Sequence, residues 1–285
     1  MAVSPRLSAS MTVLQSAMQK AARRLLRDFA DVESLQVTAK GAGDFVSQAD
    51  LRAEQTLREE LSRARPGWGF LMEESGASGA DDWDWRWVVD PLDGTTNFLH
   101  GIPHWAISVG VEKRTGENTS ELMAGCIYNP AGNEMFWAEK GMGAFLNDKR
   151  LRVSARRDMG SAVFATGIPF AKVQRKAEFS ATLARLMPHV AGVRRFGAAA
   201  LDLAWVAAGR YDGFWELGLN KWDIAAGLVI VKEAGGFLSD PAGGETHYET
   251  GDVVCGNQAL HPKLREVVAE GIAAAQAHRA AAVTS

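Results

Sequence analysis

Apolar side chains recur at helical spacing near the start of the chain, and basic side chains occupy the other faces of the same segment. Apolar positions three, four or seven apart fall on one side of an α-helix, so this pattern is typical of a helix with one buried stripe. It predicts an amphipathic helix over residues 8–29, whose apolar positions are Met11, Leu14, Met18, Leu25 and Phe29.

A second helix is indicated by its start and stop signals. Ser47 is followed three residues later by Asp50, an arrangement that resembles a capping box, in which each residue satisfies a free backbone N–H. A Pro-Gly pair at 66–67 ends the segment, whose apolar positions include Leu51, Leu57 and Leu61. Helices therefore open the fold.

After Gly69 the pattern changes to short apolar or alternating runs separated by turn residues, which is typical of β-strands. The turn over 130–132 joins two of these runs as a hairpin, and Asn147-Asp148 predicts a further turn, so we expect antiparallel pairing. The predicted strands are 69–72, 85–90, 105–112, 122–128 and 134–138.

Helices and strands alternate in the second half of the chain, which is typical of layered packing of helices on a sheet. The predicted strands are 162–166, 193–196, 211–217, 237–240 and 252–257. The predicted helices are 173–187, 199–208, 222–234 with a Gly-Gly stop at 235–236, and 260–280.

The bulk composition narrows the class of protein. The chain has 285 residues, of which 47% are hydrophobic and 23% are charged, so it can bury a sizeable core. The net charge is −3 and basic residues are scattered among acidic ones, which excludes a general electrostatic attraction to nucleic acid or to an anionic membrane. We therefore expect a small-molecule partner.

The two cysteines and the apolar segments bear on the compartment. Cys126 and Cys255 lie far apart in apolar, strand-like runs, which favours buried thiols in a reducing environment over a disulfide framework. No run approaches the ~20 apolar residues of a membrane span, and the first residues do not resemble a cleaved leader. The sequence therefore predicts a cytoplasmic protein with no membrane span.

The stretch DPLDGTTNF at 90–98 follows a predicted strand and carries the candidate chemistry. Pro91 cannot continue a strand ladder, so we expect the chain to leave the sheet there and to present Asp93 near Asp90. Two carboxylates that face each other repel unless a cation lies between them, and Mg²⁺ prefers oxygen ligands. The pair therefore predicts a metal site.

Gly94 and the residues after it suit a bound anion. A glycine lets the backbone approach a ligand closely, and Thr95 begins a stretch that favours the start of a helix, where free N–H groups point outward. A phosphate group fits such a position. Taken alone, the stretch is more typical of a structural turn, since Asp-Gly turns and Thr caps are common. An EF-hand is excluded by the spacing.

Three further motifs agree with DPLDGTTNF in order and spacing: MEES at 72–75, RRFGAAALDLAWVAAGRYDGFWELGL at 194–219 and WDIAAGLVIVKEAGG at 222–236. Together they resemble the inositol monophosphatase family of Mg²⁺-dependent, lithium-sensitive phosphatases, over nearly the whole chain. The resemblance implies an α+β fold, a layered αβαβα sandwich. It also implies a single phosphatase domain over 1–285, with an N-terminal α+β half (about 1–155) and a C-terminal α/β half (about 156–285), and a homodimer.

The resemblance also implies a set of metal ligands for two or three Mg²⁺ ions. The first Glu of EES matches Glu73, which would bind metal and help to activate water. Asp93 would bridge two ions, and Asp223, from the WD pair, would complete the second site. An Asp in the first turn of a helix also has an ordinary role, because it interacts favourably with the helix dipole. The full implied set is Glu73, Asp90, the backbone carbonyl of Leu92, Asp93 and Asp223.

Two residues match the part of the family site that orients the attacking water. Thr95 resembles the threonine that holds this water, and Asp50 matches the acidic residue that supports the threonine. Asp50 is also the predicted capping residue of the second helix, so both roles hold only if one side chain is shared. With Glu73, these residues form the predicted catalytic set.

The substrate contacts implied by the resemblance come from several segments. Glu216 carries a carboxylate that can accept hydrogen bonds from sugar or inositol hydroxyls. Many relatives have Ser or Thr where this chain has Ala198, so one hydroxyl contact is missing and selectivity for inositol phosphates is open. The implied contacts are Asp93, Gly94, Thr95, Gly197, Ala198, Ala199, Glu216 and Asp223.

The predicted function is a Mg²⁺-dependent phosphomonoesterase that hydrolyses inositol 1-phosphate, or a similar polyol or sugar phosphate, with metal-activated water and no covalent intermediate. Alternatives of the same fold are phosphatases of 3′-phosphoadenosine 5′-phosphate, fructose 1,6-bisphosphate or histidinol phosphate. An alternative of another class is a regulatory protein that binds the transcription machinery.

Overall fold

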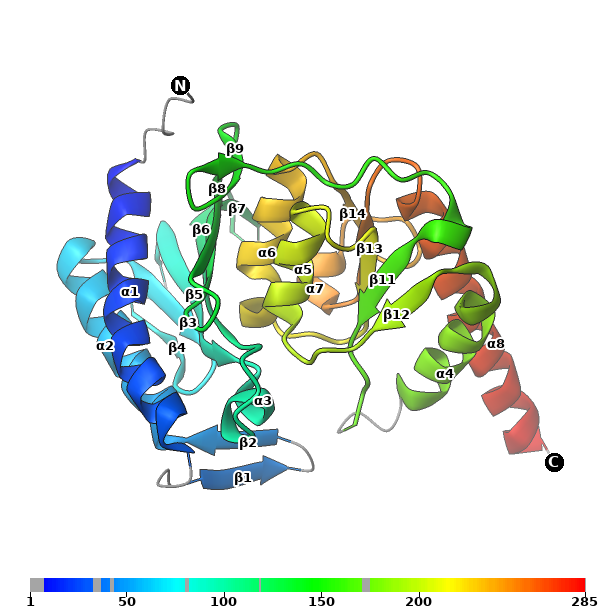
Figure 1. Ribbon diagram of the computed structural model, residues 1–285, viewed down its shortest axis with the longest axis horizontal. Coiled ribbons are helices and arrows are strands. Elements are labelled where there is room, and N and C mark those ends of the chain that lie inside the picture. The colour runs from blue at the N-terminus through cyan, green and yellow to red at the C-terminus, as the bar shows by residue number, and fades with distance from the viewer. Residues whose placement is uncertain are drawn as a thin grey trace.

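Five layers of helices and sheets follow one another across the molecule (Figure 1). Two N-terminal helices cover an eight-stranded sheet, a middle pair of helices separates that sheet from a five-stranded one, and two further helices close the far side. The predicted αβαβα sandwich is therefore confirmed. The computed structural model describes residues 8–32, 37–41, 44–79, 82–117, 119–170 and 175–284.

The first layer consists of α1 (Ala9–Ala30) and α2 (Gln48–Ala64), as the periodicity predicts. The side chain of Ser8 caps α1, because its Oγ accepts a hydrogen bond from the Met11 N–H at 3.1 Å. Most predicted apolar positions of both helices, including Leu14 and Leu57, are buried against the sheet. The expectation for Leu51 was wrong: it lies six residues before Leu57, a spacing that turns it away from the buried stripe, and it is 43% exposed. The amphipathic pattern therefore predicted both the helices and the faces that they bury.

The second layer is a sheet in the order β10-β9-β8-β7-β6-β5-β3-β4. All neighbours pair antiparallel except β3 and β5, which are parallel. That parallel pair places the carboxyl ends of two strands at one edge of the sheet. The strands are β3 (Gly69–Met72), β4 (Gly76–Ser78), β5 (Trp85–Asp93), β6 (Ala106–Arg114), β7 (Ser120–Asn129), β8 (Glu134–Glu139), β9 (Gly143–Leu146) and β10 (Lys149–Arg150).

The fourth layer is a sheet in the order β12-β11-β13-β15-β14. In it β11 pairs parallel with both β12 and β13, while β15 pairs antiparallel with β13 and β14. The carboxyl ends of β11 and β13 therefore lie side by side. The strands are β11 (Val163–Thr166), β12 (Gly192–Arg194), β13 (Gly213–Glu216), β14 (Phe237–Ser239) and β15 (Val253–Gly256).

The middle layer holds α5 (Ala199–Ala207) and α6 (Lys221–Glu233), which are apolar on nearly all sides because sheets cover them from both directions. The outer layer holds α4 (Lys176–Leu186) and α8 (His261–Thr284). Short elements link these parts: α3 (Thr95–Leu99), α7 (His247–Thr250), η2 (Met159–Ser161) and η4 (Met187–His189).

Two features of the N-terminal part differ from the sequence prediction. A two-stranded hairpin, β1 (Val37–Gly41) and β2 (Asp44–Ser47), precedes α2 and was not predicted. The expectation that the chain leaves the sheet at Pro91 was wrong, because β5 continues to Asp93. Proline is tolerated there because the pairing with β6 is interrupted by a bulge at this point.

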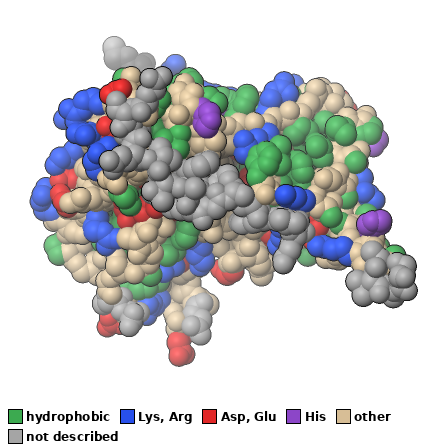
Figure 2. Space-filling view, turned by 90° about the horizontal axis from the view of Figure 1, so that it is seen from below, with side chains coloured by type: hydrophobic (Ala, Val, Ile, Leu, Met, Phe, Trp, Pro, Cys, Tyr) green, Lys and Arg blue, Asp and Glu red, His purple; other side chains and the backbone are tan. Residues whose placement is uncertain are grey.

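The surface and the thiols agree with the bulk composition. On the face shown in Figure 2, Lys and Arg side chains are scattered, with Asp and Glu between them. Cys126 and Cys255 are both buried and free. Within the described ranges, no helix combines the length and the apolar composition that crossing a bilayer requires.

Candidate active site

A bulge at the end of β5 turns two carboxylates to the same side of the sheet. Asp90 pairs with Ser108 of β6, but Asp93 pairs with Ala106, so β5 has one residue more than its partner over this stretch. Residues three apart in a regular strand face opposite sides, and one extra residue restores the same side. The bulge is therefore what lets both aspartates serve one site.

Asp90 is buried, with 2% of its surface exposed, and it lies beside a second acidic side chain. The N–H of Glu73 donates to Val89 O at 3.1 Å, which extends the parallel pairing of β3 with β5. Burial raises the pKa of Asp90 well above its usual value, and the charges of Glu73, Asp93 and Asp223 raise it further. The ends of two parallel strands thus deliver two carboxylates to one place.

Asp93 connects this sheet edge to the middle helices. Its Oδ2 accepts a hydrogen bond from the Ala200 N–H, in the first turn of α5, at 2.8 Å. Burial raises the pKa of Asp93 well above its usual value, and the charge of Asp223 raises it further, against the effect of the Ala200 N–H. Asp223 lies in the first turn of α6, where its Oδ2 accepts from the Asn220 N–H at 2.7 Å.

The donor set fits a hard divalent cation. The charges of Glu73, Asp93 and Asp223 raise the pKa of the buried Asp90, so these carboxylates repel one another unless a cation lies between them, and their oxygens are the ligands that Mg²⁺ prefers. Among the residues that the structure describes, no three His, Cys, Asp or Glu side chains stand at ligand distances from a common point. Carboxylate oxygens of Asp90, Asp93 and Asp223 accept hydrogen bonds from backbone N–H groups.

Asp50 serves two partners, one with each carboxylate oxygen. Its Oδ2 accepts from the N–H of Ser47 at 2.9 Å and from the Ser47 hydroxyl at 2.5 Å, which completes the capping box of α2. Its Oδ1 accepts from the hydroxyl of Thr95 at 3.0 Å. The side chain is fully buried, which raises its pKa, while these hydrogen bonds lower it. The predicted capping role and the predicted contact with Thr95 are therefore compatible.

Gly94 brings the end of β5 against the loop that precedes α5. It adopts a left-handed conformation, with φ +88°, which favours glycine. A Cβ at this position would lie 3.0 Å from the His104 carbonyl oxygen and 3.3 Å from the Ala198 Cβ. The glycine is needed for both the backbone angle and the close approach, and it places Gly197 and Ala198 beside the DGTT turn.

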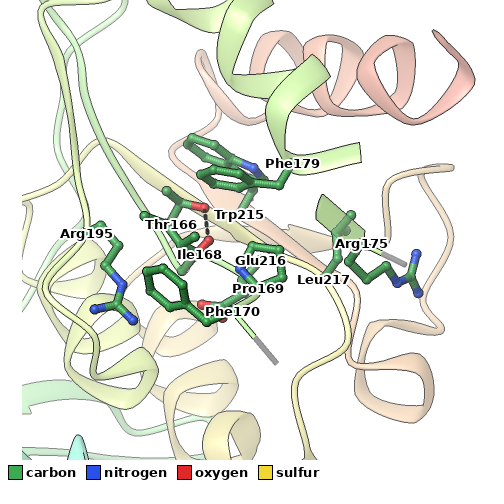
Figure 3. Close-up of a pocket in the computed structure, with 11 residues that line it drawn as sticks. Thr166, Ile168, Pro169, Phe170, Arg175, Phe179, Arg195, Trp215, Glu216 and Leu217 are labelled. Atoms are coloured by element: carbon green, nitrogen blue, oxygen red, sulfur yellow. Dashed lines mark hydrogen bonds between the residues drawn. The ribbon is translucent and has the colours of Figure 1, made fainter. Parts of the chain in front are cut away.

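Glu216 ends β13 on the other side of the site, where it lines a pocket of about 190 Å³ (Figure 3). The charge of Glu216 contributes to the raised pKa of Asp93, so the two carboxylates are near each other. Arg195 and Phe170 face this pocket, and the Arg195 guanidinium lies 5.1 Å from the centre of the Phe170 ring. The pocket is lined by Thr166, Gly167, Ile168, Pro169, Phe170, Arg175, Phe179, Arg195, Trp215, Glu216 and Leu217.

The structure thus brings the sequence-predicted residues into one region. The charges of Glu73, Asp93 and Asp223 raise the pKa of Asp90, and the Leu92 carbonyl accepts from Thr95 at 3.0 Å. Ala199 begins α5 next to the Ala200 N–H that binds Asp93. Their roles as metal ligands, catalysts and substrate contacts stay predictions.

Sequence reasoning missed two residues that shape the region. Asn97 donates from Nδ2 to the carbonyls of His104 at 2.8 Å and Phe196 at 2.7 Å, and so ties the loop before α5 to α3. Asp202 is 1% exposed, and its Oδ1 has no hydrogen-bond partner among the described residues. Burial, followed by the charges of Glu216 and Asp93, raises its pKa well above the usual value. An acidic residue in the apolar stretch AALDLAWVA was the available signal.

Comparison with known proteins identifies relatives of the whole chain. The model of the family described as "Inositol monophosphatase family" matches residues 7–276. A protein of Mesorhizobium japonicum named inositol-1-monophosphatase is 51% identical over 267 residues, which are 94% of this chain and 98% of the relative. The Nus factor SuhB of Escherichia coli K12 is 38% identical over 266 residues, 92% of this chain and 98% of that protein.

A solved structure shares the fold along its full length. The extragenic suppressor protein suhB of Bartonella henselae superposes with a TM-score of 0.88 at 49% sequence identity. The match covers 93% of this chain and 100% of that one. The layered architecture and the sequence motifs therefore lead to the same group of proteins.

Proposed function

The chain belongs to the inositol monophosphatase family, and on that premise we propose that it hydrolyses inositol 1-phosphate, or a similar small polyol phosphate, to the free alcohol and inorganic phosphate. Relatives about half identical to it are named inositol-1-monophosphatase. The observation that supports the proposal is that Glu73, Asp93 and Asp223, from three separate motifs, lie close enough to the buried Asp90 for their charges to raise its pKa.

The family is generally Mg²⁺-dependent, and the residues present suit that ion. Glu73, Asp90, Asp93 and Asp223, with the carbonyl of Leu92, would hold two or three Mg²⁺ ions. When bound, Mg²⁺ lowers the pKa of water and neutralises charge on the phosphoryl oxygens. The chain's own contribution is to hold these oxygens on rigid strand ends and on the first turn of α6.

Thr95 would orient the attacking water. Its hydroxyl proton is shared between two acceptors, Asp50 Oδ1 and Leu92 O, both at 3.0 Å. While the hydroxyl donates to one of these acceptors, its oxygen can still accept a hydrogen bond from a water molecule. Asp50 fixes this direction because α2 holds its other oxygen. Glu73, which directly follows the neighbouring strand β3, is the acidic residue that would take part in activating the water.

The alcohol part of the substrate would contact the second half of the chain. Glu216 would accept hydrogen bonds from hydroxyl groups, and Gly197, Ala198 and Ala199 would border the ring through their backbone. Gly94 and Thr95 would offer backbone N–H groups to the phosphate, beside Asp93 and Asp223. Ala198 is fully buried and supplies no hydroxyl, so selectivity depends more strongly on Glu216.

The test is phosphate release from a panel of substrates. Inositol 1-phosphate, fructose 1,6-bisphosphate, histidinol phosphate and 3′-phosphoadenosine 5′-phosphate are each assayed with Mg²⁺, with EDTA, and with Mg²⁺ plus lithium. We expect hydrolysis of inositol 1-phosphate that requires Mg²⁺ and is inhibited by lithium. If the protein prefers one of the other three compounds, that compound takes the place of inositol 1-phosphate as the proposed substrate. If folded protein supplied with Mg²⁺ hydrolyses none of the four, the proposal is overturned.

A second candidate function is a regulatory one, because relatives 38% identical to this chain are named Nus factor SuhB. A pull-down with RNA polymerase and its elongation factors tests it directly. A stable complex that survives with the catalytically silenced variant Asp93→Asn would support a regulatory role beside catalysis. Failure to form any complex would remove this candidate and leave the phosphatase.

Three further points are proposals from the family resemblance. We propose a single phosphatase domain whose two halves meet near residue 155, a homodimer, and a cytoplasmic location. The buried free thiols of Cys126 and Cys255 support a reducing compartment. Light scattering on the purified protein tests the dimer, cell fractionation tests the location, and expression of 1–155 alone, which we expect not to fold, tests the single domain.

A further inference from the structure

Gly167 and Glu216 come from neighbouring strands and meet at the same edge of the five-stranded sheet. Thr166, the last residue of β11, pairs with Trp215 of β13, so the next residue on each strand is Gly167 on one and Glu216 on the other. Both line the pocket shown in Figure 3. Ligands of sheets commonly bind outside the carboxyl ends of parallel strands, which is where this pair lies.

The carboxylate of Glu216 occupies the space that a side chain at position 167 would need. A Cβ built on Gly167 would approach Oε1, Cδ and Oε2 of Glu216 to well under 3.0 Å, a separation that real Cβ atoms essentially never show. The three nearest atoms all belong to Glu216. The Glu216 side chain therefore lies across the bare backbone of Gly167.

The backbone itself does not require a glycine at this position. Gly167 is absent from the residues with positive φ, unlike Gly94 or Gly197, so an L-residue could adopt its conformation. Its carbonyl accepts a hydrogen bond from the Thr166 hydroxyl at 3.2 Å, which a side chain at 167 would leave intact. The position of the Glu216 carboxylate is therefore what excludes a larger residue at position 167.

We propose that Gly167 is a positioning residue that sets the specificity of the site for hydroxyl-bearing phosphates by holding Glu216 in place. The inference rests on the proposed function, in which Glu216 accepts hydrogen bonds from the polyol. A methyl group at 167 displaces the carboxylate from the backbone that directly follows β11 and moves it relative to Asp93 and Asp202, whose pKa values it raises. The hydroxyl contact is then lost, while the catalytic carboxylates keep their places.

The displacement changes recognition more than stability. The atoms that must move are the far end of a flexible side chain, and the pocket beside them offers about 190 Å³ of space. An overlap with backbone would instead shift a whole element, as at Gly125, where a Cβ would lie 2.6 Å from the Ala226 Cα. We therefore expect Gly167→Ala to fold as the wild type does.

The experiment compares two substrates in the full-length protein with Mg²⁺. For Gly167→Ala we expect KM for inositol 1-phosphate to rise about tenfold, the effect of one lost hydrogen bond to a charged group. We expect kcat to stay within about threefold, and both constants for phenyl phosphate, which has no hydroxyl groups, to stay unchanged. Gly132→Ala is the matched control, because Gly132 is exposed and a Cβ there has nothing closer than 3.3 Å.

A double-mutant cycle separates positioning from a general structural effect. In the Glu216→Ala background, adding Gly167→Ala should leave KM for inositol 1-phosphate unchanged, because the group through which Gly167 acts is gone. Additive effects of the two substitutions would overturn the inference, as would an unchanged KM in the single Gly167→Ala variant of an active enzyme.

A crystal structure of Gly167→Ala gives a readout that does not depend on turnover. The Glu216 carboxylate should be displaced from its wild-type position, and an unmoved carboxylate would overturn the inference. Failure of the proposed function would show in a different experiment, in which the wild-type protein releases no phosphate from inositol 1-phosphate. The two failures are therefore distinguished by the wild-type assay.

Discussion

The eight-stranded and the five-stranded sheet both end at the candidate site, but they supply different kinds of residue. On the first side, Glu73, Asp90 and Asp93 follow closely along the chain and lie at the ends of two adjacent strands. On the second side, Gly167 and Glu216 are far apart in sequence and meet only through the pairing of β11 with β13. The first side concentrates charge, and the second shapes the space beside it.

This difference separates chemistry from recognition. A short motif can carry several charged groups, which one strand end and one bulge are enough to bring together. Loss of any one of these charges should therefore abolish most of the turnover. The shape of the substrate pocket depends on contacts between distant segments, which can change in small steps. Substitutions on the first side should therefore affect kcat strongly, and those on the second side should affect KM.

The largest effect should come from Asp93→Asn. The amide keeps the size of the side chain and can still accept from the Ala200 N–H, but it removes the charge that a metal ligand needs. We expect kcat for inositol 1-phosphate to fall by about 10³-fold. Because burial and Asp223 raise the pKa of Asp93, its ionised form costs stability above that pKa, and the variant should be more stable than wild type at pH 8 in EDTA.

Phosphate-release kinetics and thermal unfolding in EDTA measure the two parts of this prediction. Asp84→Asn is the matched control, because Asp84 is an exposed carboxylate just before the same strand. Near-normal turnover of Asp93→Asn would remove Asp93 from the metal set.

A smaller loss should follow from Thr95→Val, which replaces the hydroxyl by a methyl group of similar size. The variant cannot hold a water molecule through Oγ1, and it leaves Asp50 Oδ1 without its donor. We expect kcat to fall about 100-fold with little change in KM, within the usual range for loss of a positioned proton-transfer group. Thr95→Ser keeps the hydroxyl and should retain most of the activity, whereas equal loss in both variants would contradict the role of the hydroxyl.

The same division explains what could be predicted from the sequence. Helical and strand periodicity predicted α1, α2, β5, β6 and α6, because each buries a continuous stripe or face. The bulge that aligns Asp90 with Asp93 was not predictable, since it depends on the register against β6. The roles of Asn97 and Gly167 depend on contacts with residues brought near only by the fold, at Phe196 and Glu216.

A third prediction concerns the helix that joins the two sides. A Cβ at Gly125 of β7 would lie 2.6 Å from the Ala226 Cα, so Gly125→Ala must push α6 away from the sheet. We expect a loss of about 1–3 kcal/mol in the free energy of unfolding. Because Asp223 lies on α6, kcat should also fall, by about tenfold, when the helix shifts.

Urea unfolding and phosphate release measure both effects, and Gly132→Ala serves again as the control for a Gly-to-Ala change at an exposed position. Loss of stability with unchanged kcat would mean that Asp223 is placed independently of the packing of α6 on the sheet.

The smallest expected effect is on the free energy of unfolding below pH 6.5, and it concerns a contact between the two sides. His104, in the segment before β6, packs edge-on against Phe196 and Trp205, with ring centres 5.1 and 5.2 Å away. Burial lowers the pKa of His104 to about 4 from its usual 6.5. Between these values the unfolded chain binds a proton that the folded protein does not, so stability must fall as the pH falls from 6.5 to 4.

His104→Phe keeps an aromatic ring in this contact and removes the titrating group. The difference in unfolding free energy between wild type and variant should shift by about 1–3 kcal/mol in favour of the variant as the pH falls through this range. Urea unfolding at pH 7, 5.5 and 4 measures it, and the exposed His278, changed to Gln, is the control. A parallel pH profile for wild type and His104→Phe would mean that protonated His104 is accommodated in the fold.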